Sequence, residues 1–154
     1  AVRIDMPGRV DAFATAAMPA LNLPYLCAVI LLDGRLDLVA SQSRERMTGD
    51  PAVRALMARV TVVHDPDQER TPRAESARVT VIRRDGVTRT NYVPAVDGYP
   101  SHPLPTDRVE AKARELLEPV LGPAGAARVV ALVATIEDLP SVAPLVEALT
   151  PTEG

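Results

Sequence analysis

The segment from Asn22 to Gly34 constrains the fold more than any other part of the sequence. It predicts a short helix, because Asn22 can cap its start, Pro24 suits a first turn, and Gly34 can adopt the left-handed conformation that ends a helix. Apolar residues cover every face of this helix: Tyr25, Ala28, Val29 and Leu32 on one side, and Leu26, Cys27, Ile30 and Leu31 on most of the rest. Such a helix must be buried all round or enter a membrane, and this one is far shorter than the ~20 residues that a bilayer requires. We therefore expect it to be covered on both sides, with another domain or subunit supplying the second cover.

The composition is that of a globular protein and excludes several classes of partner. Apolar residues make up 47% of the 154 residues, and the net charge of −3 comes with arginines scattered among acids, so no basic stripe suggests nucleic acid. The single cysteine, Cys27, rules out an internal disulfide and a cysteine metal cluster, and is expected to be a buried small hydrophobe. One cysteine fits a reducing compartment, and no signal peptide or membrane span stands out. We expect a cytoplasmic protein with no nucleic-acid or membrane partner.

The regions on either side of the apolar helix predict strands and one brief helix. Residues 2–6 alternate apolar and charged side chains, as a half-buried strand does. Residues 60–64 predict a second strand, with Val60, Val62 and His64 on one side and Thr61 and Val63 on the other. Between them, Asp50 and Pro51 predict the N-cap and first turn of a helix. The polar run over residues 65–75 predicts a long, mobile loop.

A β-hairpin is predicted around Asp85-Gly86, which is the strongest short turn signal in the sequence. A type I′ turn suits this pair, because both of its central positions need positive φ. With such a two-residue loop, Arg84 faces Val87 across the hairpin. Four residues then share the face that we expect to be core: Val79, Val81, Thr90 and Tyr92.

The remainder of the chain predicts helices only, after a proline-rich connection over residues 98–105. Thr106 is expected to cap the first helix, and Gly122 with Pro123 to separate it from the second. The second helix is expected to bury Val129, Val130, Val133 and Ile136. A last amphipathic helix is expected to begin at Val142.

The order of these elements favours one fold class. A strand, helices, three further strands and more helices predict an α+β two-layer sandwich, with a mainly antiparallel sheet and helices packed on one face. We expect one domain over residues 1–150 and a disordered tail over residues 151–154.

Common catalytic and metal-binding motifs are absent from the sequence, so no metal or cofactor is predicted. It contains no phosphate-binding glycine loop, HExxH, CxxC or Gly-x-Ser-x-Gly motif. His64 has no second histidine or cysteine at ligand spacing and is expected to be a solvated strand end. Glu137 and Asp138 are adjacent carboxylates in equally wet surroundings, so they are expected to be solvated and not an acid–base pair.

Two residues remain as candidates for a functional site. Tyr25 opens the apolar helix, and a buried phenol must find a hydrogen-bond partner, so the alternatives are core packing and a role in a site. His102 lies beside Pro103 in the proline-rich connection, where fixed φ angles can hold a loop rigidly against a neighbour. A small stand-alone enzyme would rest on these two residues alone, and no pair of base and nucleophile supports it.

Several short motifs occur in one order along nearly the whole chain: Leu23-Pro24-Tyr25 followed by Ala28 and Leu31-Leu32-Asp33-Gly34, then Asp50-Pro51-x-Val53, Asp85-Gly86, and Gly98-x-Pro100-x-His102-Pro103 leading to Lys112. In this order they resemble the C-terminal domain of the MmgE/PrpD family, which includes 2-methylcitrate dehydratase, cis-aconitate decarboxylase and iminodisuccinate epimerase. The sequence departs from the family pattern at four positions: Ala20 and Leu21, where some relatives are polar, His102, where Asn is more frequent, and Ala113, where Phe is more frequent.

The resemblance implies a two-domain lyase that uses no metal or organic cofactor. Such enzymes remove water or carbon dioxide from small di- or tricarboxylates, or epimerise them, in a cleft between this domain and a preceding helical domain that usually dimerises. On this basis Tyr25 is expected to be catalytic and His102 to bind substrate. The expected partners are the helical domain, in the same chain or a separate subunit, a small carboxylate substrate, and further copies in a homo-oligomer. The isolated chain is expected to be inactive; the alternative is a non-enzymatic binding or dimerisation module that retains the fold.

Overall fold

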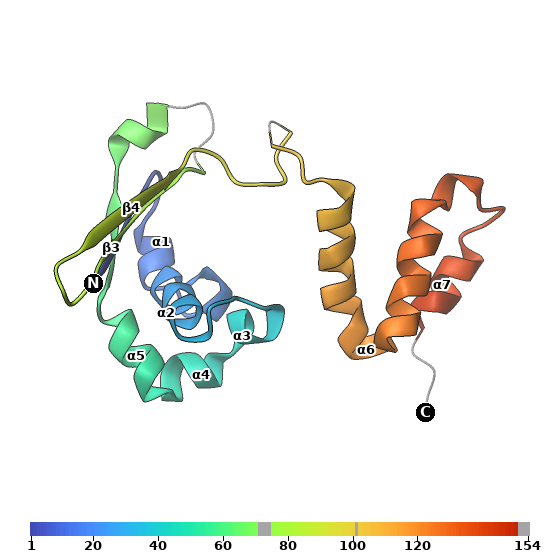
Figure 1. Ribbon diagram of the computed structural model, residues 1–154, viewed down its shortest axis with the longest axis horizontal. Helices are drawn as coiled ribbons and strands as arrows, with labels where there is room; N and C mark the ends of the chain where they lie inside the picture. The colour runs from blue at the N-terminus through green and yellow to red at the C-terminus, as the bar shows by residue number, and fades with distance from the viewer. Residues whose placement is uncertain (71–74, 101, 151–154) are drawn as a thin grey trace. The chain divides into compact units, whose positions relative to one another are not determined.

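The computed structural model describes residues 1–70, 75–100 and 102–150 (Figure 1). They form two compact units, one ending at His102 and one beginning at Pro103. Each unit is described by itself, so the single domain expected over residues 1–150 stays a prediction. The tail expected to be disordered, residues 151–154, lies outside the described residues.

The first unit contains a four-stranded sheet with the order β2-β1-β3-β4 among its described residues. These strands are β1 (Val2–Met6), β2 (Val60–His64), β3 (Ala77–Ile82) and β4 (Thr88–Val93). The β1 and β2 strands run parallel, whereas the β1–β3 and β3–β4 pairs are antiparallel. The predicted α+β class with a mainly antiparallel sheet is therefore confirmed.

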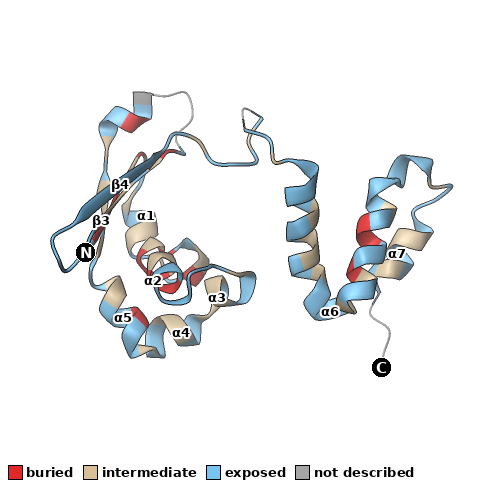
Figure 2. Cartoon of the chain, in the orientation of Figure 1, coloured by how far each residue is buried: buried red, intermediate tan, exposed pale blue. Residues whose placement is uncertain are grey.

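Short helices form the second layer of this unit, beside the sheet (Figure 1). They are α1 (Asp11–Ala14), the 3₁₀ turn η1 (Pro19–Leu21), α2 (Leu23–Asp33), α3 (Leu38–Gln42), α4 (Arg44–Gly49) and α5 (Pro51–Met57). Helices α1 and α2 contact β2, and α2 also contacts α5. The buried residues gather where these helices meet, around Tyr25, Ala28, Val29 and Val53 (Figure 2).

Local capping signals place the helix ends as predicted. The backbone N–H of Tyr25 donates to the side-chain oxygen of Asn22 at 2.9 Å, and Gly34 has the left-handed φ of 73°. Asp50 caps α5 in the same way, accepting hydrogen bonds from the next backbone N–H groups at Ala52 and Val53. Both helix starts and the end of α2 are therefore confirmed.

The hairpin forms, but its predicted register is wrong by one residue. The backbone N–H of Arg83 donates to the carbonyl of Val87, so the loop has three residues, and only Gly86 among them has positive φ. A type I turn closed by a left-handed glycine replaces the predicted type I′ turn. The one-residue shift turns Thr90 and Tyr92 away from the face of Val79 and Val81. All of β4 is exposed, so the predicted core face is wrong for this strand (Figure 2).

The loop after β2 begins with an anchored segment. Pro66–Arg70 forms a 3₁₀ helix, η2, in which Gln68 is only 3% exposed. Its side-chain amide donates to the carbonyl of Asp5 at 2.9 Å and to the carboxylate of Asp65 at 2.8 Å. This part of the segment is fixed to the sheet, which corrects the expectation of a mobile loop there. Residues 71–74 of the predicted loop lie outside the described residues.

The second unit is helical throughout its described residues, with α6 (Thr106–Ala134), η3 (Ile136–Asp138) and α7 (Ala143–Leu149). Helix α6 is interrupted at Gly122, which has φ 70° and ψ 170°, so the predicted break at Gly122-Pro123 is confirmed. By length and composition α6 is apolar enough to cross a membrane. However, the interruption leaves two segments that are each shorter than the ~20 residues that a span needs.

Two details of the second unit differ from the prediction. Pro105 occupies the N-cap position and Thr106 is the first helical residue, without a capping hydrogen bond from its side chain. Val133 and Ile136 are 51% and 44% exposed, whereas Val129 and Val130 are buried as predicted. Helix α7 packs on α6, and one layer of contacts covers only part of the apolar stripe.

Candidate functional site

Tyr25 lies in the first turn of α2, and its side chain is fully buried in the core cluster with Ala28, Val29 and Val53. Its hydroxyl donates a hydrogen bond to the backbone carbonyl of Ala40 at 2.5 Å. Burial raises the pKa of the Tyr25 phenol, and the nearby positive charge of Arg46 opposes this shift. The arrangement therefore holds a neutral phenol that fastens α2 to α3.

Arg46 on α4 connects the end of α2 to the start of α5. Its guanidinium donates to both carboxylate oxygens of Asp33, at 2.5 and 2.7 Å, and its Nε lies 3.7 Å from the Asp50 carboxylate. The hydrogen bonds from Arg46 lower the pKa of Asp33. A bidentate pair of this kind fixes the direction of both side chains, so Arg46 is held close to the Tyr25 phenol.

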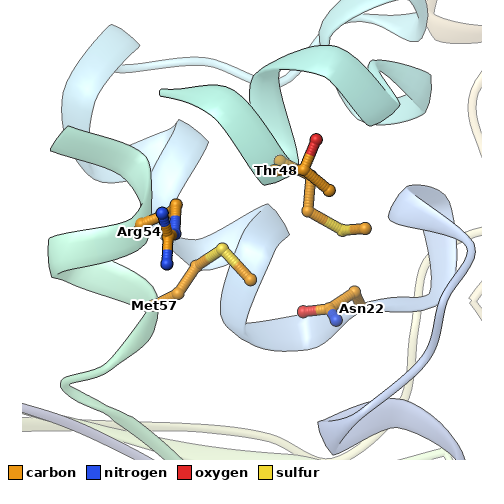
Figure 3. Close-up of a pocket in the computed structure, with 5 residues that line it drawn as sticks. Asn22, Thr48, Arg54 and Met57 are labelled. Atoms are coloured by element: carbon orange, nitrogen blue, oxygen red, sulfur yellow. The ribbon is translucent and has the colours of Figure 1, made fainter. Parts of the chain in front are cut away.

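An open pocket of about 480 Å³ lies where the start of α2, α4 and α5 meet (Figure 3). Its lining residues are Asn22, Met47, Thr48, Arg54 and Met57. Two of them, Met47 and Met57, also pack against the core cluster that contains Tyr25. Met47 and Met57 thus line the pocket and also pack against the core cluster of the candidate tyrosine.

A second open depression, of about 490 Å³, lies along α4 and its ends. It is lined by Ser43, Glu45, Arg46, Gly49 and Asp50. The Arg46 guanidinium that faces it is already paired with two carboxylates, those of Asp33 and Asp50. The positive charge in this depression is therefore already balanced and is not left for an anionic ligand.

Helix α2 is covered on one side only by the described residues of its own unit. Ile30 and Leu31 are 44% and 49% exposed, while Ala28 and Val29 on the other side are fully buried. Cys27 is half-buried, and burial raises the pKa of its thiol. The second cover that the sequence predicts is not supplied by the described residues of the first unit.

His102 is exposed at the end of the first unit and takes part in a tight backbone turn. Its N–H donates to the carbonyl of Tyr99 at 2.8 Å, and its carbonyl accepts from the N–H of Gly98 at 2.7 Å. It lines neither of the two openings near Tyr25. Neither of these two openings therefore contains both predicted site residues.

The other sequence candidates lie at the surface. His64 is exposed at the end of β2, as expected, and its Nε2 forms a hydrogen bond with Glu69 at 2.8 Å. Glu137 and Asp138 are exposed in η3, which fits the prediction that they are solvated. Over residues 1–70, 75–100 and 102–150, no three side chains of the metal-ligating types come together.

Sequence reasoning missed the pairing of Arg46 with Asp33 and the pocket at Arg54. One signal was available for the first, because Asp33 is an acid at the negative end of a helix and needs a cation nearby. The pocket has no such signal, since its lining comes from three helices whose packing is not encoded in local spacing.

Comparison with known proteins identifies one family for this chain. The family model described as the MmgE/PrpD C-terminal domain matches residues 2–138, which is most of the chain and includes residues of both units. No curated protein matches the sequence.

Proposed function

Because the chain belongs to the MmgE/PrpD family as its C-terminal domain, we propose that it is the substrate-covering domain of a cofactor-independent lyase. The proposed substrate is a small di- or tricarboxylate such as 2-methylcitrate or cis-aconitate, and the reaction is loss of water or carbon dioxide, or epimerisation. The family match over residues 2–138 is the observation that carries this proposal. In the cell we propose a cytoplasmic homo-oligomer.

A C-terminal domain of a multidomain family implies an N-terminal partner domain. We propose that this helical domain covers the open side of α2, where Ile30 and Leu31 are exposed next to half-buried Cys27. Burying that side removes apolar surface from water, which is the main favourable term in association. The isolated chain is expected to be inactive, because the remaining catalytic groups belong to the partner domain.

Within this proposal Tyr25 is the catalytic residue and His102 contacts substrate. The raised pKa keeps the Tyr25 phenol protonated at neutral pH, which suits a hydrogen-bond donor or a general acid. The Tyr25 hydroxyl donates a hydrogen bond to the carbonyl of Ala40, so a substrate has to replace that carbonyl as the acceptor. The Arg46–Asp33 pair keeps the segment that carries Ala40 in place while this happens.

The test is turnover by the protein that contains both domains. We would assay it with 2-methylcitrate, citrate, cis-aconitate and iminodisuccinate, and compare Tyr25→Phe with Tyr92→Phe, an exposed tyrosine on β4. Loss of the proton-donating group is expected to lower kcat by about 10²-fold or more in Tyr25→Phe alone. Equal turnover by the two variants would show that the Tyr25 hydroxyl takes no part in the reaction. Absence of turnover of every substrate by the two-domain protein would contradict the proposed lyase activity.

The alternative function is a non-enzymatic module in which the same open side of α2 meets a second copy. The exposed side chains of Ile30 and Leu31 support this alternative as well as they support docking of the helical domain. Sedimentation of the isolated chain separates the two, with Ile30→Glu as the variant and Val87→Glu in the hairpin as the matched control. A dimer that only Ile30→Glu dissociates supports the module, whereas a monomer that binds the helical domain supports the lyase.

A further inference from the structure

We propose that the pocket between α4, α5 and the start of α2 binds a small aliphatic monocarboxylate. The carboxylate would pair with Arg54, and the aliphatic chain would lie against Met47 and Met57. All the lining residues belong to the first unit, so this inference does not rest on the proposed lyase function.

Arg54 supplies the charge for an anionic group. In the described part of the chain its side chain makes no ion pair or hydrogen bond, whereas neighbouring Arg46 is held by Asp33 and Asp50. A planar guanidinium with its donors unused matches a carboxylate in bidentate geometry. In Figure 3 Arg54 lies on α5 at the edge of the opening, one turn from Met57. An anion there would balance a positive charge that the fold leaves uncompensated.

Arg54 is the one charged residue among the described lining residues, and the other two polar side chains already make hydrogen bonds, which favours a ligand with one charge. The side chain of Asn22 accepts from the N–H of Tyr25 and donates to the carbonyl of Ala16. The hydroxyl of Thr48 donates to the carbonyl of Arg44. A second or third carboxylate in the pocket would find no second cation among the described lining residues, so a monocarboxylate fits better than a tricarboxylate.

The two methionines supply an apolar wall. Both pack against the buried cluster and are partly exposed, so they offer thioether surface that is held in place from behind. Thioethers are polarizable and adapt to aliphatic chains of different shape. The opening of about 480 Å³ has room for a chain of a few carbons.

The experiment follows the methyl signals of ¹³C-labelled methionines in this chain. The chain has four methionines, so Met6 and Met18 outside the pocket are internal references for Met47 and Met57. The probes are butyrate, 1-butanol, which keeps the chain and lacks the charge, inorganic phosphate, which lacks the chain, and citrate. Butyrate is expected to shift the Met47 and Met57 signals saturably, and to bind about tenfold tighter than each other probe.

Variants identify the charge that binds. Arg54→Gln is expected to weaken butyrate binding about tenfold. Arg54→Lys is expected to bind butyrate with an affinity between those of the wild type and Arg54→Gln, because lysine keeps the charge without the fork geometry. Arg59→Gln, an exposed arginine just beyond α5 and outside the lining, is the matched control and should bind as the wild type does. All these side chains are at the surface, so the fold is expected to persist in each variant.

Several results would overturn the proposal. Equal shifts at all four methionines would show non-specific binding, and equal affinity for butanol would show a purely apolar pocket. Phosphate or citrate binding as tightly as butyrate would show a general anion site. Unchanged butyrate affinity in Arg54→Gln would exclude the assigned cation. None of these results bears on turnover by the two-domain protein, so each proposal can fail alone.

Discussion

The hydroxyl of Tyr25 donates to the backbone carbonyl of Ala40, which links the first turn of α2 to α3. This residue is the predicted catalytic group and is also a fully buried member of the core cluster. A variant at this position therefore changes the stability of the fold as well as any chemistry. The two effects need separate measurements, and the first prediction concerns stability alone.

Tyr25→Phe is expected to lower the free energy of unfolding by about 1 kcal/mol, since it keeps the ring and removes one partly buried hydrogen bond. Urea denaturation of the isolated chain measures the change. Tyr92→Phe is the matched control, because Tyr92 is exposed and its ring lies under the Arg78 guanidinium at 5.3 Å. An equal, small loss in both variants would show that the bond to Ala40 contributes nothing.

The Arg46–Asp33 pair predicts a specific dependence of stability on pH. The hydrogen bonds from Arg46 hold the pKa of Asp33 below its ordinary value of about 4. The pair therefore stabilises the folded state above that pH, and its contribution falls as the pH drops through the lowered pKa. Arg46→Gln should raise the NMR titration midpoint of the Asp33 carboxylate and flatten the loss of stability below about pH 4. Arg44→Gln, an exposed arginine on the same helix, should leave the midpoint unchanged.

Two glycines are expected to respond in opposite directions to alanine. Gly86 has φ 83° in the hairpin loop, so Gly86→Ala should destabilise the chain by about 1–2 kcal/mol. Gly49 ends α4 without positive φ, and an added Cβ would meet nothing within 4 Å, so Gly49→Ala should stabilise by about 0.5 kcal/mol. Thermal unfolding followed by circular dichroism gives both signs. A stabilising Gly86→Ala would contradict the three-residue loop.

The thiol of Cys27 is expected to react slowly with disulfide reagents. Burial raises its pKa, so less thiolate is present at pH 8 than in a free cysteine, and the rate should keep rising above the pH at which a free thiol levels off. The measurement is the initial rate against pH, with the unfolded chain in denaturant as the control. A folded chain that reacts as fast as the unfolded one would contradict this burial.

Predictions that depend on neighbouring residues were confirmed at α2, at α5 and at the break in α6, although the predicted cap of α6 was displaced by one residue. Asn22 and Gly34 bound α2, and Asp50 starts α5, because capping hydrogen bonds and positive φ involve residues a few positions apart. The break at Gly122 has the same origin. These features are visible in sequence because no distant contact is needed to form them.

Neighbouring residues did not determine the register of the hairpin. Asp85-Gly86 fits both a two-residue loop and a three-residue loop, and the choice changes which side chains share a face. In the observed register Tyr92 lies beside Arg78, where their cation–π contact and the Thr80–Thr90 hydrogen bond are found. Cross-strand contacts of this kind select the register, and the sequence pattern does not display them.

The candidate site was predicted only in part for a related reason. Periodicity identified Tyr25 as part of a helix that is apolar on all faces, but not that its hydroxyl reaches Ala40. Likewise periodicity identified the apolar stripe of α6 that includes Val133. Periodicity does not show which other segments pack on this stripe, and Val133 is exposed. Pairing across helices, as for Arg46 and Asp33, is set by tertiary packing.

The pairing of β1 with β3 joins residues that are far apart in the sequence, with Val2 opposite Val81 and Ile4 opposite Val79. The chain between them must be closed into a loop before this part of the sheet can form, which slows folding. In the second unit α6 and α7 contact each other as sequence neighbours. Refolding should accordingly recover helical structure rapidly and the sheet late, so that the strands of the first unit are the part of the chain exposed to aggregation during synthesis.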